Sequence, residues 1–111
     1  MADVKLIETD TYKESLNKFD KSIRPAIEKK VLKLKENPEL GKPLLYSKLR
    51  ELLIGNKYRV IYALSNSKDV DLLYVIPFGA FHKKELNNKY QKVLPEFEKE
   101  LETLKKGLDK L

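Results

Sequence analysis

The sequence predicts an α+β domain: a strand and two helices, then a three-stranded antiparallel meander, then a helical extension at the C-terminus. Two observations point to this fold class. Runs rich in Val, Leu, Ile and Tyr, broken by turn residues, occupy the middle of the chain, and apolar residues at helical spacing occupy both flanks. A length of 111 residues suits one domain with one core, and the helices are expected to pack on one face of the sheet.

The N-terminal third is expected to hold a strand and two helices. V-K-L-I-E over residues 4–8 has the alternating character of a short strand, and polar cap residues follow it. Apolar residues at helical spacing over 12–19 predict the first helix. The second helix is expected to begin with a cap near Asp20, because Pro25 then falls in its first turn, and to end at Asn37.

The centre of the chain has the pattern of a hairpin extended to a meander. Residues 41–43, Gly-Lys-Pro, mark a loop before it, and Gly-Asn-Lys at 55–57 is typical of a hairpin turn. The polar stretch 65–69 predicts a second turn, and Pro77 is expected to end the last strand because proline cannot donate to the ladder. The three predicted strands are residues 48–54, 58–64 and 70–76.

Helical periodicity governs the C-terminal part of the chain. From Tyr90 onward, apolar residues recur at alternating steps of four and three, the spacing of a heptad seam. Pro95 interrupts the seam, and an interior proline costs about 3 kcal/mol, so we expect one helix ending near Lys92 and another starting at Pro95. The seam is short for a coiled-coil dimer, which favours docking on the same chain. Residues 1–92 form the predicted domain, and 93–111 are its helical extension.

Composition excludes several kinds of site. The chain has no cysteine and a single histidine, so thiolate metal sites and cysteine nucleophiles are excluded, and we expect no metal and no cofactor. No apolar run approaches the ~20 residues that cross a bilayer. Residues 1–10 are too polar and acidic for a signal peptide. We therefore expect a cytoplasmic protein that does not bind membranes.

The positive charge of the chain is concentrated in one segment. The whole chain carries a formal charge of +6, yet residues 21–59 alone hold eleven Lys and Arg against four acids. Such a local excess indicates a surface for phosphate-rich partners or for an acidic protein. The alternative, equally compatible with the residue counts, is that these lysines simply solvate a helix face.

The candidates for chemistry are basic and phenolic side chains. Glycine-rich phosphate loops and the common hydrolase motifs are absent from the sequence. The remaining candidates gather near one end of the predicted meander and just after it. They are Lys48, Arg50, Lys57, Arg59, His82, Lys83, Lys84 and Tyr90.

Strand parity makes Arg59 the most informative of these residues. It shares a strand face with Ile61, and an arginine beside apolar side chains needs a polar partner. Its head is expected to reach either water or Glu51 on the neighbouring strand. A single histidine such as His82 is more often a surface residue than a catalytic base.

Short motifs on the predicted strands carry a family resemblance. Tyr-Arg-Val-Ile-Tyr at 58–62, within the longer match 49–62, is followed by Leu-Leu-Tyr-Val-Ile at 72–76 and Phe-His-Lys-Lys at 81–84. This order resembles the RelE/ParE superfamily of toxins from bacterial and archaeal toxin–antitoxin pairs. The first motif is similar to the family's YRxxY strand, and the last is similar to the F-x-K-K of HigB-like members. The resemblance covers residues 4 to about 92.

The resemblance implies a RelE-like microbial RNase fold and a metal-independent endoribonuclease that cuts mRNA on the ribosome. In such a reaction a ribose 2′-OH attacks the adjacent phosphate, and cations stabilise the developing charge. By motif position, Arg59 contacts the scissile phosphate. Lys83 or Lys84 corresponds to the basic residue after the last strand, which holds phosphate or donates a proton, and Lys84 is the catalytic candidate. Arg50 is a further cation, and Tyr90 stacks on a base or assists proton transfer. The implied RNA-binding residues are Lys48, Lys57, His82 and Lys83.

A second activity within the same superfamily stays open. ParE-type members share the fold, bind DNA gyrase and cut no RNA, and a degenerate member would retain only antitoxin binding. Leu53 stands where HigB-like members carry a second arginine, which favours this alternative. Lys48 and Arg50, however, have the spacing of a lysine pair in RelE-type members. Each toxin activity implies a cognate antitoxin, acidic or amphipathic, as partner.

Overall fold

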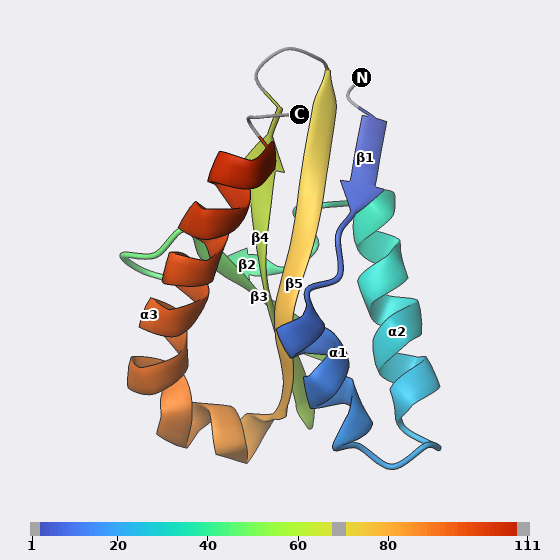
Figure 1. The fold of residues 1–111 in the computed structure, drawn as a ribbon. Helices are drawn as coiled ribbons and strands as arrows, with labels where there is room; N and C mark the ends of the chain where they lie inside the picture. The colour runs from blue at the N-terminus through green and yellow to red at the C-terminus, as the bar shows by residue number, and fades with distance from the viewer. Residues whose placement is uncertain (1–2, 68–70, 109–111) are drawn as a thin grey trace.

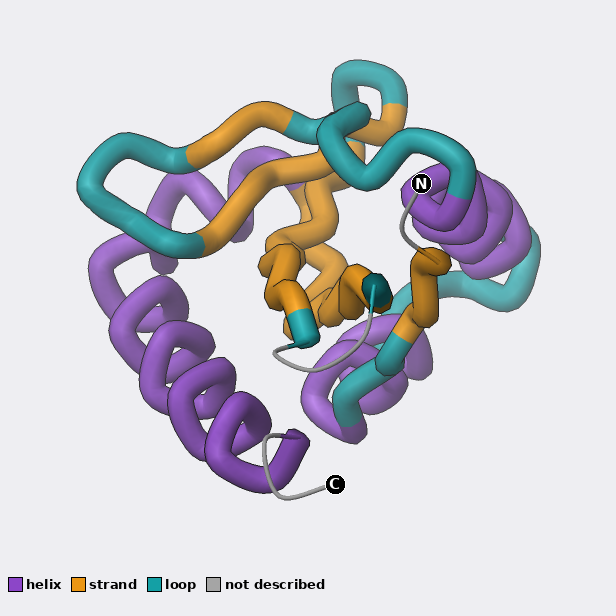
Figure 2. Tube along the Cα trace, turned by 90° about the horizontal axis from the view of Figure 1, so that it is seen from above, coloured by secondary structure: helices purple, strands orange, loops and turns teal. Residues whose placement is uncertain are grey.

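A five-stranded sheet between two helical layers forms the core of the structure, a computed structural model that describes residues 3–67 and 71–108. Figure 1 shows two short helices on one side of the sheet and one long helix on the other. The view along the sheet in Figure 2 shows the strands enclosed between these helices. The predicted α+β class is confirmed, but only the first two helices share a face of the sheet.

The strands run in the order β1-β5-β4-β3-β2 across the sheet. The predicted meander is confirmed, because β3, β4 and β5 pair antiparallel in sequence order, and β1 adds to β5 in parallel. The strand bounds are β1 Asp3–Leu6, β2 Lys42–Pro43, β3 Leu49–Ile54, β4 Tyr58–Asn66 and β5 Leu72–His82.

Two short helices follow β1. The first, α1 (Asp10–Asn17), is capped by Thr9, whose hydroxyl accepts a hydrogen bond from the amide of Tyr12 at 3.1 Å. The second, α2 (Arg24–Leu32), starts later than the cap near Asp20 predicts, because the Asp20 side chain instead closes a turn by accepting from the amide of Ser22.

The end of α2 also differs from the prediction. The helix stops at Leu32 and tightens into the 3-10 turn η1 (Lys33–Lys35) before Asn37 is reached. Such a turn satisfies the last carbonyls of a helix with hydrogen bonds between residues three apart, such as that from the Glu36 amide to the Lys33 carbonyl at 3.1 Å.

Prolines and polar residues do not end the strands where the sequence predicts. β5 continues through Pro77 to His82, because the ladder carries a bulge there: Ile61 pairs with Gly79 and Tyr62 with Pro77. A bulge is a position at which a strand needs no amide donor. β4 continues through Ser65 to Asn66, whereas the predicted strand start at Val70 lies outside the described residues.

The predicted loop over 41–43 also contains regular structure. Lys42 and Pro43 form the edge strand β2, where Lys42 pairs with Glu51 and Pro43 with Arg50. An edge position accommodates the proline because one side of an edge strand needs no partner.

The C-terminal segment is one helix, α3 (Lys83–Leu108), and the predicted break at Pro95 is wrong. The apolar seam on both sides of the proline packs on one continuous sheet face, where Val93, Phe97 and Leu101 are buried. Burying side chains of this size contributes about 1.5–3 kcal/mol each, which outweighs the ~3 kcal/mol cost of one interior proline.

The two sheet faces hold separate cores, and β4 contributes to both. Val60 and Tyr62 pack toward α1 and α2, whereas Ile61 and Ala63 pack toward α3. This alternation is the period of two expected of a strand buried on both faces. Arg59 falls on the α3 face, as parity predicts. No helix among the described residues is both long and apolar enough to span a bilayer.

Candidate functional site

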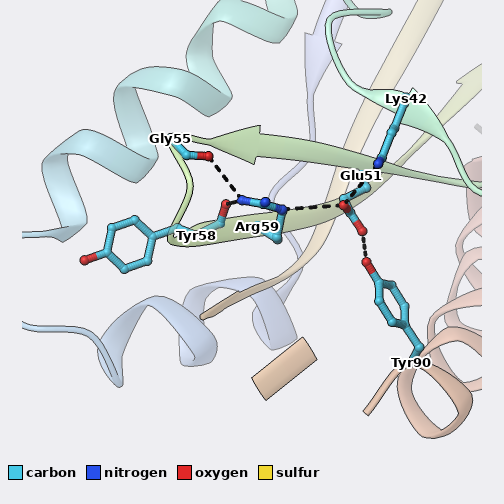
Figure 3. A network of polar contacts seen from close by, with 6 residues as sticks. All are labelled: Lys42, Glu51, Gly55, Tyr58, Arg59 and Tyr90. Carbon is cyan, nitrogen blue, oxygen red and sulfur yellow. Dashed lines mark hydrogen bonds and ion pairs between the residues drawn. The ribbon is translucent and has the colours of Figure 1, made fainter. Parts of the chain in front are cut away.

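Arg59 lies at the centre of a closed polar network between β3, β4 and α3 (Figure 3). Its side chain is 7% exposed. Its Nε is 3.5 Å from Oε1 of Glu51, and one of its terminal nitrogens donates to the carbonyls of Tyr58 at 2.7 Å and Gly55 at 3.2 Å. The predicted contact between Arg59 and Glu51 is confirmed, and the guanidinium faces protein acceptors rather than an open cleft.

Glu51 joins Arg59 to the C-terminal helix. Its carboxylate is buried and accepts a hydrogen bond from the hydroxyl of Tyr90 on α3, and Lys42 on β2 approaches it at 4.0 Å. A buried charge pair needs further hydrogen bonds to offset the loss of hydration, and this network provides them. The arrangement neutralises the arginine and ties α3 to the sheet.

Arg50 lies on the opposite face of the sheet. It pairs with Tyr62, a residue of the core under α1 and α2, and residues directly paired across two strands share a face. Its side chain donates to the Tyr62 hydroxyl at 3.2 Å and to the carbonyl of Gly41 at 2.8 Å. Arg50 therefore holds the loop before β2 in place and stands apart from Arg59.

That loop passes very close to the sheet. A Cβ on Gly41 would come within 2.6 Å of the carbonyl oxygen of Glu51 and 2.7 Å of the Tyr62 ring, so only glycine fits there. The Tyr62 hydroxyl accepts from the Gly41 amide and donates to the carbonyl of Pro38 at 2.8 Å. Arg50 and Tyr62 thus hold the loop before β2 against the sheet.

Lys48 contacts α3 far along the helix from Tyr90. Its ammonium forms an ion pair with Glu102 at 3.1 Å, and that hydrogen bond, with the positive charge of Lys48, lowers the pKa of Glu102. Ser47 donates to Glu98 one turn earlier at 2.6 Å. Both contacts are at or near the surface and fasten the β2–β3 loop to α3.

The remaining predicted cations line one hollow. It has a volume of about 580 Å³ and lies where the β3–β4 turn meets the start of α3. Lys57, His82, Lys83 and Lys84 line it together with Asn56 and Asn87. The amide of Lys83 donates to the carbonyl of Lys57 at 2.8 Å, which holds the two segments together.

An aromatic cluster adjoins the hollow. The His82 ring stacks on Phe19 with centroids 4.7 Å apart, and Tyr58 lies 5.3 Å from His82. Of these three residues only His82 is exposed, whereas Phe19 is buried and Tyr58 is half-buried. Cations beside an exposed ring are typical of surfaces that bind single-stranded nucleic acid. Arg59 is not among the residues that line this hollow.

The structure separates the eight predicted site residues. Four line the hollow, Arg59 and Tyr90 join Glu51 in the closed network, Arg50 lies across the sheet, and Lys48 contacts Glu102. Sequence reasoning identified Glu51 as a partner of Arg59 but missed Lys42, which carries no motif and reaches Glu51 through strand pairing. Leu53, directly paired with Arg59, is 40% exposed beside it.

Comparisons with known proteins give the chain a family. A family model described as the ParE toxin of the type II toxin–antitoxin system parDE matches residues 1–77. No curated protein matches the sequence.

Two solved structures share the fold. The toxin–antitoxin complex RelBE2 from Mycobacterium tuberculosis aligns with a TM-score of 0.58 at 22% identity, over 70% of this chain and 95% of that chain. A mutant of the E. coli toxin RelE in the free state aligns with a TM-score of 0.58 at 19% identity, over 86% of this chain and 98% of that one. The family model spans most of the chain and the predicted RelE/ParE resemblance is confirmed. The chain belongs to the ParE family within the RelE/ParE superfamily, and it is a toxin of a type II toxin–antitoxin system.

Proposed function

We propose that this toxin acts by binding a protein target, DNA gyrase in the manner of ParE-type members, and that it does not cut RNA. One observation carries the proposal: the arginine that would hold the scissile phosphate is buried and paired with Glu51. To bind phosphate, Arg59 would have to leave a buried ion pair, and breaking such a pair costs about 3–5 kcal/mol.

The separation of the other cations supports the same proposal. Stabilising the charge of a phosphorane-like transition state requires several donors within hydrogen-bond distance of one group. Arg50 lies on the other face of the sheet from Arg59, so the two cannot contact one phosphate in this arrangement. The match of residues 1–77 to the ParE family model favours a protein target as well.

The cellular test compares macromolecular syntheses after induction of the toxin. Pulse labels for DNA and protein should show DNA synthesis falling first, with signs of DNA damage, whereas an endoribonuclease would stop protein synthesis first. With purified components, the toxin should inhibit supercoiling by gyrase and leave mRNA uncut in a translating extract. Toxin-dependent cleavage of mRNA, with gyrase unaffected, would refute the proposal.

The second candidate is the metal-independent endoribonuclease acting on ribosome-bound mRNA. The hollow lined by Lys57, Lys83 and Lys84 favours it, because its volume of about 580 Å³ accommodates a nucleotide beside the His82 ring. In this mechanism Arg59, Lys84 and Tyr90 keep the catalytic roles implied by the superfamily, and α3 has to shift before Arg59 can reach RNA. Arg50, on the other face of the sheet, does not contact the same phosphate.

Surface variants separate these candidates without disturbing the core. The double variant Lys83→Ala with Lys84→Ala removes two exposed cations from the hollow, and Lys29→Ala with Lys33→Ala removes two exposed cations from the α2 region. Under the gyrase proposal neither pair abolishes growth inhibition. An RNA-cutting toxin would lose activity through the first pair alone. Arg59→Ala is a weaker test, because it also leaves Glu51 buried without its partner.

The antitoxin partner follows from the family. The similar M. tuberculosis structure is a toxin–antitoxin complex, and we propose that this chain is likewise neutralised by a cognate antitoxin. A formal charge of +6 favours an antitoxin of net negative charge, because opposite charges speed the encounter of two proteins. Co-expression with the product of the adjacent gene should abolish toxicity.

A further inference from the structure

Tyr12 carries a buried hydroxyl that the rest of the protein does not use. Its side chain, on α1, is fully buried, and the hydroxyl has no hydrogen-bond partner among the described residues. Most buried polar groups are paired, and an unpaired one carries a desolvation penalty. This unpaired group therefore requires an explanation.

A small pocket of acidic character lies beside that hydroxyl. It has a volume of about 100 Å³ and is formed where β1, α1 and α2 meet. Its lining residues are Leu6, Glu8, Tyr12, Glu28, Val31 and Leu32. Burial, and then the negative charges of Glu8 and Glu28, raise the pKa of Tyr12, so the hydroxyl stays protonated and lies within the field of both carboxylates.

The size and lining of the pocket restrict what can occupy it. About 100 Å³ is well below the 300–1,000 Å³ of ordinary small-molecule sites and corresponds to the liquid volume of roughly three waters. Two carboxylates fall short of the six or more oxygens that Ca²⁺ takes. One ammonium or guanidinium group fits better, because its N–H groups can donate to Glu8, Glu28 and the Tyr12 oxygen.

We propose that this pocket receives one cationic side chain, of lysine or arginine, from the cognate antitoxin. Charge complementarity supports the occupant: residues 1–20 hold five acids against three lysines in a chain whose overall charge is +6. Leu32 at the pocket is 55% exposed, so it offers an apolar contact for the stem of that side chain. The proposal rests on the antitoxin partner proposed above, but not on the identity of the toxin's target.

Such a contact would orient the partner. The basic surface of this toxin attracts an acidic antitoxin in many orientations, whereas a cation that enters this small acidic pocket fixes one of them. A mismatched partner would leave the carboxylates and the Tyr12 hydroxyl unpaired on association, which penalises the wrong pairing. The pocket thereby contributes specificity beyond the overall attraction of charge.

The pocket is tested with a simple cation on the full chain. We expect n-butylammonium chloride, titrated into the ¹⁵N-labelled toxin, to produce saturable amide shifts around Glu28 and Leu32. Sodium chloride and 1-butanol, at equal concentration, control for ionic strength and for the apolar stem. Glu28→Gln should weaken binding at least fivefold and Tyr12→Phe at least twofold, whereas Glu36→Gln, an exposed acid outside the pocket, should not. Shifts that do not saturate, or that 1-butanol reproduces, would overturn the pocket.

The occupant is tested with the antitoxin encoded beside the toxin. Glu28→Lys should weaken its binding at least tenfold, and the matched charge reversal Glu36→Lys at most twofold. Equal losses for the two variants would overturn the assignment of the antitoxin cation. If no adjacent product binds the wild-type toxin, the antitoxin proposal fails and takes this occupant with it, whereas the n-butylammonium titration still decides the pocket.

Discussion

The ion pair of Arg59 and Glu51 shows how a single residue pair joins three elements. Both side chains are almost fully buried, and Tyr90 and Lys42 complete the contacts of the carboxylate. In a dry environment the pair gives modest net stability, because desolvation opposes the Coulomb attraction, but the loss of one partner leaves a buried charge. In the structure, Arg59 therefore helps to hold β3, β4 and α3 together, and we propose that this is its main role.

Glu51→Gln should reveal this role directly. Because the variant removes the charge that neutralises Arg59, the free energy of unfolding should fall by about 3 kcal/mol, measured by urea denaturation. Glu85→Gln serves as control, since Glu85 forms an exposed i,i+4 pair with Lys89 worth about 0.5 kcal/mol or less. Similar losses for both variants would contradict a structural role for the buried pair.

Tyr12→Phe should stabilise the free toxin. The variant removes a buried hydroxyl that lacks a partner in the structure and keeps the ring that packs beneath α1 and α2. The penalty of an unsatisfied buried group is about 1–3 kcal/mol, so a rise of about 1 kcal/mol in the free energy of unfolding is expected. A fall would mean that the hydroxyl has a partner in solution, such as water.

The helix α3 continues through a proline at which the local sequence predicts a break. Pro95 lies inside a continuous helix of 26 residues, although it removes one backbone hydrogen bond and its ring opposes regular geometry. The helix persists because its apolar seam is buried along its length, and because side chains at Ser47, Lys48 and Thr11 bind its acidic face.

Pro95→Ala should therefore make α3 more stable without changing its path. Restoring the amide should raise the free energy of unfolding by up to about 3 kcal/mol, the difference between proline and alanine within a helix. Gly107→Ala, also in α3, is the comparison. A Cβ at residue 107 meets no atom within 4 Å, so this variant should raise the free energy of unfolding by about 1 kcal/mol at most. No gain from Pro95→Ala would indicate a break or kink at this position.

Two acids on α3 should give the stability opposite dependences on pH. Burial raises the pKa of Glu100, against the hydrogen bond from Thr11, so its stabilising contribution is present at low pH and is lost as pH rises through the folded pKa. The hydrogen bond and charge of Lys48 lower the pKa of Glu102, so its contribution is present above the ordinary glutamate pKa and is lost as pH falls.

Thermal melts of two glutamine variants between pH 7 and pH 4 separate the contribution of Glu100 from that of Glu102. Glu100→Gln should raise Tm at pH 7 relative to wild type and lose that advantage near pH 4. Glu102→Gln should lower Tm at pH 7 and converge with wild type as the pH falls. Parallel curves for the two variants would contradict the assigned directions.

At the scale of the whole molecule, the two faces of the sheet differ in the cores, polar contacts and pockets that they hold. The face under α1 and α2 holds one core, the Arg50 contacts and the acidic pocket, and the face under α3 holds the second core and the Arg59 network. The second core exists only because α3 returns along the sheet (Figure 1). The helical extension over 93–111 is thus expected to be part of the folding unit.

A chain that ends at Lys92 tests this expectation. It would lack Val93, Phe97 and Leu101, whose burial contributes on the order of 5–9 kcal/mol, comparable with the 5–15 kcal/mol that stabilises a whole domain. We expect no cooperative unfolding transition by circular dichroism, whereas a chain ending at Leu108 should retain it. A cooperative, soluble fragment of residues 1–92 would show that the extension is dispensable for folding.

The candidate site was predictable in its residue types and only partly in its geometry. Parity along one strand placed Arg59 beside Ile61 and offered Glu51 as its partner, and the motif order placed Lys83 and Lys84 after the last strand. The face of Arg50 follows from the same parity, because Arg50 and Glu51 are adjacent in one strand and only Glu51 shares a face with Arg59. The contact of Tyr90 with Glu51 was not predictable, because it depends on how α3 packs on the sheet.

By itself, the sequence determined the order of the strands and the helices and the apolar periodicity that each presents, because these depend on neighbours within a few residues. Only the tertiary structure decided that Pro77 lies at a bulge, that Pro95 lies within a helix, and that Arg59 is enclosed. Those outcomes depend on burial against segments distant in the chain, whose free energy exceeds the local preference of any one residue.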